Sequence, residues 1–244
     1  MARTSRKLMH NEAPLLSSSL IRRAIIIAVI IICFVAALNI GVKWYGERIL
    51  QAGHTTATDA VEITIGNDLL KLAKNTLRVP SDRHDGERER ADLYLTWPGL
   101  KGYEDSNRAV FDDPAQAAGL IFIQLSQSTM SEDMSGRFGP IYARLTEGEP
   151  VPLKHGLTLH RLRADAGYGK EVILTGQREG ESDYVVRCLL PQTQQESTGS
   201  DCQRDIHAGQ DLSLFYRFSA TLLPQWKELD AGVKRYIEQR LVKD

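Results

Sequence analysis

The stretch AIIIAVIIICFVAALNIGV, residues 24–42, divides this chain of 244 residues into a short basic start and a long outer part. It holds no charged residue, and its one polar side chain is Asn39. As an α-helix rising about 1.5 Å per residue, it would cross the hydrocarbon core of a bilayer, which is about 30 Å thick. A lone strand would leave its backbone groups unpaired in lipid, so the stretch predicts one N-terminal transmembrane helix.

The charges beside this stretch predict its orientation. Trp44 and Tyr45 follow it directly, where aromatic residues of the membrane interface are expected. The positive-inside rule places residues 1–23 in the cytoplasm and leads, through a juxtamembrane linker at 43–60, to a periplasmic domain at 61–244. The basic side chains before the stretch, against the single acid Glu12, are Arg3, Arg6, Lys7, Arg22 and Arg23.

Three other N-terminal signals compete with an uncleaved anchor. A cleaved signal peptide would use Val35-Ala36-Ala37 as its small-residue site, but the basic start is long and the apolar run continues beyond that site. A twin-arginine export signal would need more than the arginine pair present here. A lipoprotein would need a small residue before Cys33, where isoleucine stands. The favoured location is the inner membrane of a bacterial cell, with the lipid bilayer as one partner.

Cys188 and Cys202 lie in the outer part, separated by the polar insert LLPQTQQESTGSD. The insert is typical of a mobile loop between two strands. Two unpaired buried thiols are the alternative, but an oxidising periplasm favours a disulfide between these cysteines. Closing a loop of roughly 15 residues would stabilise the fold by about 3 kcal/mol in the chain-entropy model.

The outer part is predicted to be mainly β, in the α+β class, with an antiparallel meander of strands. Apolar and polar residues alternate at 61–65, 93–97 and 212–218, while LIFIQL at 120–125 is apolar on both faces, as in a central strand. Further strands are expected at 141–145, 157–163, 171–178 and 183–190.

The spacing of the apolar residues changes near the C-terminus. Steps of three and four residues there predict an amphipathic helix packed on the sheet. Pro224 is acceptable in its first turn. The apolar stripe consists of Leu222, Leu223, Trp226, Leu229, Val233, Tyr236, Ile237 and Leu241.

No sequence motif assigns chemistry to the outer domain. The formal net charge of −1 gives no case for nucleic-acid binding. Asp82, His84 and Asp85 are metal-ligand types, but they stand in a charge-rich segment typical of a solvated loop. We therefore predict no metal, no cofactor and no recognisable catalytic site.

The segment YLTWPGLKGY offers the best binding candidates, Tyr94, Trp97 and Tyr103, because aromatic rings beside Pro-Gly can stack on a sugar or peptide. Trp97 shares a strand face with Leu93 and Leu95, so a core role is the favoured interpretation for it.

The stretches LYLTWPGLKGY, DMSGRFGPIYARL and CQRDIHAGQDLSLFYRF together resemble a group of uncharacterised, single-pass, membrane-anchored bacterial envelope proteins. The resemblance implies a location and no activity. The sequence thus favours a non-enzymatic envelope protein that binds an envelope protein or cell-wall partner. The alternative is an anchored hydrolase of cell-wall or surface carbohydrate, working through acids such as Asp92, Glu104, Glu132 or Asp133.

Overall fold

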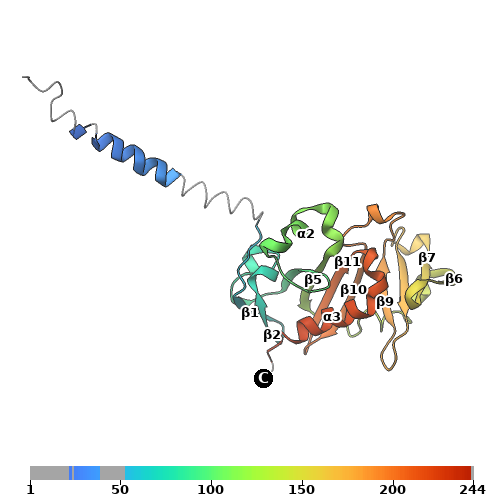
Figure 1. Ribbon diagram of the computed structural model, residues 1–244. Helices are drawn as coiled ribbons and strands as arrows, with labels where there is room; N and C mark the ends of the chain where they lie inside the picture. The colour runs from blue at the N-terminus through green and yellow to red at the C-terminus, as the bar shows by residue number, and fades with distance from the viewer. Residues whose placement is uncertain (1–21, 24, 39–52, 243–244) are drawn as a thin grey trace, which may run out of the picture. The chain divides into compact units, whose positions relative to one another are not determined.

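An eight-stranded antiparallel sheet forms the centre of the outer unit, Gly53–Asp244, in a computed structural model (Figure 1). The strand order is β4-β5-β11-β10-β9-β8-β7-β6. The strands are β4 (Arg90–Thr96), β5 (Leu120–Gln127), β6 (Thr146–Pro152), β7 (Leu157–Leu162), β8 (Val172–Gly176), β9 (Tyr184–Cys188), β10 (Cys202–Ala208) and β11 (Leu212–Phe218).

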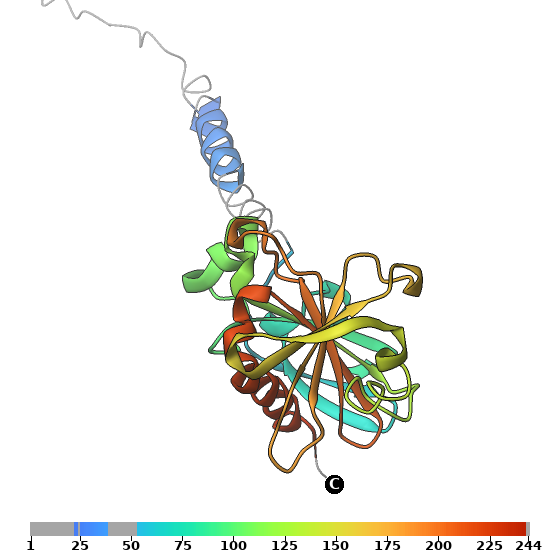
Figure 2. The ribbon, with the colours of Figure 1, turned by 90° about the vertical axis from the view of Figure 1, so that its right-hand side faces the viewer.

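The predicted antiparallel meander is confirmed from β6 to β11, where each strand pairs with the next in sequence. Figure 2 views the sheet from its β6 end and shows the successive rotation of its strands. The prediction of a strand at 141–145 is wrong, because Tyr142–Leu145 is a 3-10 turn and β6 begins only at Thr146. Tyr142 is buried in a small apolar cluster with Met134 and Ile173, which holds this segment against the sheet.

A second, three-stranded sheet has the order β2-β1-β3, with β1 (Ala60–Ile65), β2 (Asp68–Ala73) and β3 (Gly86–Glu87). β1 pairs with β2 antiparallel and with β3 parallel. The Asp68 carboxylate accepts the backbone N–H groups of Gln210 and Asp211, at 2.9 and 3.0 Å, in the turn between β10 and β11. These bonds fasten the small sheet to the large one.

The C-terminal helix α3 (Trp226–Glu238) packs on the large sheet, as the apolar stripe predicts (Figure 1). Pro224 lies in the 3-10 turn Ala220–Gln225 directly before α3, and not in the first turn of the helix as predicted. Trp226, Leu229, Val233 and Ile237 are at most 2 % exposed and share one core with the inward residues of β1, β2, β4, β5 and β11. Gly176 of β8 allows the close approach of Trp226, because a Cβ there would lie 2.7 Å from the indole ring.

The connections between the strands contain one short helix and several 3-10 turns. The helix α2 spans Arg108–Asp112, and the peptide bond between Trp97 and Pro98 is cis. 3-10 turns occur at Lys74–Thr76, Pro80–Asp82, Asp105–Asn107, Pro114–Gly119, Tyr142–Leu145, Lys154–Gly156, Ala164–Ala166, Gln194–Glu196 and Ala220–Gln225.

The disulfide between Cys188 and Cys202 is present, as predicted. The two residues are directly paired across β9 and β10, and both are fully buried. The insert between them contains the 3-10 turn Gln194–Glu196, and Asp201 accepts hydrogen bonds from the hydroxyls of Ser197 and Thr198. The bridge therefore closes a locally hydrogen-bonded loop.

The structure describes residues 22–23, 25–38 and 53–242. Residues 25–38 are helical, while Ala24 and residues 39–42 of the predicted span lie outside the described residues. Within the described ranges, no helix is long and apolar enough to cross a membrane. The outer unit begins at Gly53, inside the predicted linker 43–60.

Candidate functional site

Two of the three aromatic binding candidates lie inside the protein. Tyr94 is 2 % exposed and Tyr103 is fully buried. Both contact the His54 ring: Tyr103 stacks on it at 4.7 Å between centroids, and the Tyr94 hydroxyl lies 2.8 Å from its Nδ1. Phe111 of α2 completes this aromatic cluster. Burial raises the pKa of Tyr94 to about 12, so its hydroxyl stays protonated.

Trp97 is separate from that cluster and lies half-buried at the edge of the core. Its Nε1 donates to the side chain of Gln225 at 2.8 Å, and its ring approaches Gly232 of α3. It lines a shallow hollow of about 410 Å³ with Leu100 and Tyr236. The structure thus combines the favoured core role with partial access to the surface, and ligand binding by Trp97 stays a prediction.

The acids considered for hydrolysis take part in local contacts on different elements. Asp92 of β4 pairs with Arg90 at 2.9 Å. Glu104 caps a 3-10 turn, and Asp133 accepts the backbone N–H of Gly136. Each of these three acids has a local structural partner, and the fourth, Glu132, lies against Gly136.

A serine–histidine pair also occurs, with Ser128 Oγ lying 3.0 Å from His207 Nε2. The same hydroxyl donates to the carbonyl of Met130 at 2.9 Å, so the imidazole is the donor to Ser128. An activated nucleophile would instead give its proton to the histidine. The pair is therefore arranged as a turn contact.

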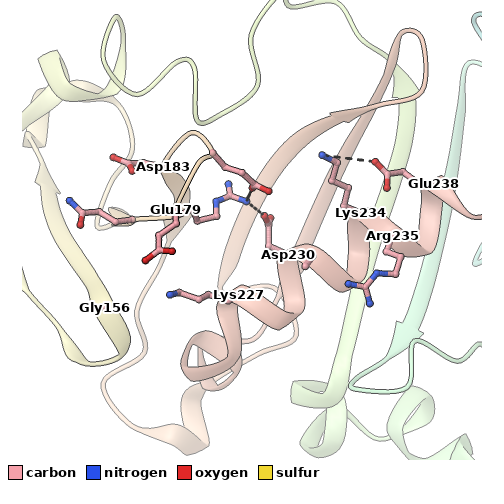
Figure 3. Close-up of a pocket in the computed structure, with 12 residues that line it drawn as sticks. Gly156, Glu179, Asp183, Lys227, Asp230, Lys234, Arg235 and Glu238 are labelled. Carbon is pink, nitrogen blue, oxygen red and sulfur yellow. Dashed lines mark hydrogen bonds and ion pairs between the residues drawn. The ribbon is translucent and has the colours of Figure 1, made fainter.

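A hollow with a volume of about 1060 Å³ lies between α3 and the connection from β8 to β9. We call it the charged groove. Figure 3 shows Glu179 and Asp183 on the connection and Lys227, Lys234 and Arg235 on the helix. Four cationic and five acidic side chains line it, so its charges nearly balance.

A buried ionic network forms the floor of the charged groove. Asp230 of α3, only 3 % exposed, accepts bonds from Arg204 Nε at 2.8 Å, Arg178 Nη1 at 2.7 Å and the Tyr216 hydroxyl at 2.5 Å. Arg204 also donates to the backbone carbonyl of Val185. Two arginines thus share one carboxylate below the protein surface.

The contacts within the network stabilise the cationic form of Arg204 and the protonated form of Tyr216. Burial alone lowers the pKa of Arg204, but Tyr216 and Asp230 beside it raise that pKa above its ordinary value. Burial, reinforced by the negative charge of Asp230, raises the pKa of Tyr216 well above its usual range. Tyr216 therefore stays protonated as a donor, and Arg204 stays cationic.

The sequence contains a signal for this network. Arg204 stands two residues after Cys202 and two before Ile206, on the inward face of β10. Asp230 stands four residues after Trp226, inside the apolar stripe of α3. A charged residue at an inward position in each of two packed elements predicts a buried pair.

No protein-family model and no curated protein matches this sequence at a significant level. Among solved structures, the fold is similar to Smlt3025, an immunity protein of the Stenotrophomonas maltophilia type IV secretion system, with a TM-score of 0.52 and 15 % identity over 78 % of this chain and 96 % of that one. The iron-regulated outer membrane lipoprotein FrpD of Neisseria meningitidis gives a TM-score of 0.45 and 12 % identity over 77 % and 95 %. At these identities the similarity concerns the fold.

Proposed function

We propose that this chain is a membrane-anchored protein of the bacterial cell envelope whose outer domain binds another protein and performs no catalysis. In this proposal residues 24–42 span the inner membrane, residues 1–23 are cytoplasmic and the domain from Gly53 onward is periplasmic.

The helix at residues 25–38 supports the anchor. Its side chains are isoleucine, valine, alanine, phenylalanine, leucine and cysteine, and they are exposed all round, with Ile32 and Phe34 at 67 % and 64 %. A helix that is apolar on every side needs an apolar environment, and a bilayer supplies it. The disulfide supports an oxidising compartment beyond the membrane.

The observation that carries the binding role is the charged groove, because its floor is a fixed ionic network and its walls present charges of both signs. Charge patterns of this kind give specificity and orientation to protein–protein contacts. The fold shared with the Smlt3025 immunity protein supports a binding role as well. No observation favours the carbohydrate hydrolase, so we do not propose it.

The topology is tested with reporters fused after residue 244. We expect alkaline phosphatase to be active there and a fluorescent protein that matures only in the cytoplasm to stay dark. Fusions after residue 20 should give the reverse result. An inactive phosphatase fusion together with a bright fluorescent fusion would contradict the orientation of the anchor.

The binding role is tested by photo-crosslinking of the full chain in living cells. A crosslinking amino acid at Ala231, an exposed residue of α3 in the charged groove, should give a discrete crosslinked band with one protein. The same amino acid at Lys170, in an exposed turn outside the groove, is the control. Recovery of no protein at any of a set of surface positions, with turnover of polysaccharide by the purified chain, would establish the hydrolase instead.

A further inference from the structure

The charged groove has two walls of opposite sign. The connection between β8 and β9 supplies Glu179, Glu181 and Asp183, all exposed. The other wall is the exposed side of α3, which supplies Lys227, Lys234 and Arg235, together with Glu238, which pairs with Lys234 at 3.9 Å (Figure 3). Within the described residues, neither Lys227 nor Arg235 has a carboxylate at ion-pair distance.

The floor between these walls carries one positive charge in excess. Arg204 and Arg178 share the single carboxylate of Asp230. Arg204 is 1 % exposed, whereas the Arg178 side chain is 19 % exposed and faces the groove. Arg178 is therefore the member of the network that can meet a ligand.

Arg178 already pairs with an exposed carboxylate, that of Glu181, which a ligand carboxylate could replace. Its Nη1 lies 3.2 Å from Glu181 Oε2, and the Glu181 side chain is 66 % exposed. Because the Glu181 carboxylate is largely solvated, replacing it by another carboxylate costs little free energy. A guanidinium prefers planar carboxylates, which it can bind with two parallel hydrogen bonds.

The two walls restrict what can bind. A purely anionic ligand at Arg178 would be repelled by Glu179 and Asp183, and a purely cationic ligand would be repelled by the α3 wall. A ligand with a carboxylate and an ammonium group can satisfy both. The volume of about 1060 Å³ lies at the upper end of small-molecule sites, which suits a length of peptide chain.

We infer that the charged groove receives an exposed segment of the protein partner, with a carboxylate side chain of that segment beside Arg178 in place of Glu181. An ammonium side chain of the same segment lies against Glu179 and Asp183. This inference rests on the proposed protein-binding function and names the surface and the chemistry of the partner.

The test uses the full chain in detergent micelles and the blocked peptide N-acetyl-Glu-Ala-Ala-Lys-amide as the probe, measured by titration calorimetry. We expect saturable binding with a dissociation constant on the order of 1 mM or tighter. Replacing either charged residue of the probe by Gln should weaken binding at least about fivefold. Binding should also weaken between 0.1 and 1 M salt, over which the Debye length falls from about 10 to 3 Å.

Charge reversal in the protein gives the sharper result. The double variant E179K/D183K should lose the preference for the Lys-containing probe and bind N-acetyl-Glu-Ala-Ala-Glu-amide at least about fivefold better than the original probe. The matched control K170Q removes a charge from an exposed turn outside the groove and should bind like the parent. Melting curves of both variants should match the parent, since all three positions are exposed.

Three results would overturn the inference: no saturable binding, equal binding of the Gln-substituted probes, or equal binding of phosphate or putrescine alone. A protein partner whose crosslinks map outside the groove would refute this surface while leaving the anchored binding function intact. Failure of the reporter and crosslinking tests would instead refute the function itself.

Discussion

A chain that ends at Thr221 should fail to keep its outer domain folded. The deletion removes Trp226, Leu229, Val233 and Ile237, which are at most 2 % exposed in the shared core. Burial of one such side chain stabilises by about 1.5–3 kcal/mol, so the four together supply on the order of 10 kcal/mol. That amount is comparable to the whole stability of a typical domain, about 5–15 kcal/mol.

The measurement compares near-ultraviolet circular dichroism, thermal unfolding and protease resistance of the truncated and parent chains. A chain that ends at Val242 is the control, because it keeps α3 and the backbone bond from Val242 to Leu69. Glu228→Ala, an exposed change on the same helix, should shift stability by less than about 0.5 kcal/mol. A truncated chain that melts at the parent temperature would show that the sheet does not need α3.

Local pattern predicts most of the elements in the outer domain. The alternation of LSLFYRF matches β11, residues 212–218, because one face of that strand is buried. The helical stripe likewise matches the buried face of α3. The error at 141–145 arises because a few apolar residues suit a buried 3-10 turn as well as a strand, and local sequence does not distinguish them.

The strand order could not be predicted to the same extent. β5 lies between β4 and β11, although about 85 residues separate β5 from β11 in sequence. The parallel pair of β1 and β3 joins a strand to a two-residue segment that has no apolar pattern. Such pairings depend on where distant segments meet, and no local pattern encodes that.

The candidate site was missed for a related reason. The aromatic residues of YLTWPGLKGY include Tyr94 and Tyr103, whose rings pack in an internal cluster with His54. The charged groove is assembled from the connection between β8 and β9 and from α3, and its network includes Arg204 of β10, so these residues are distant in sequence. The local sequence indicates this site only through charged residues at inward positions, namely Arg204 in β10 and Asp230 in α3.

Replacing Asp230 by Ala should destabilise the outer domain by about 3–5 kcal/mol. The change leaves Arg204, which is 1 % exposed, without its carboxylate and also removes the acceptor of the Tyr216 hydroxyl. Breaking a buried ion pair on one side costs this much because the remaining charge stays desolvated. Denaturant unfolding of the full chain, followed by tryptophan fluorescence, measures the loss.

Two further variants distinguish the cost of an unpaired buried charge from a simple loss of contacts on α3. Glu238→Ala removes the exposed pair with Lys234, whose atoms lie 3.9 Å apart, and should change stability by less than about 1 kcal/mol. The double variant D230L/R204M removes both buried charges and should recover much of the stability lost in Asp230→Ala, since apolar replacements of buried pairs are often neutral or stabilising. A double variant no more stable than Asp230→Ala would show that the network contributes through its hydrogen bonds to Val185 and Tyr216, and not through charge neutralisation.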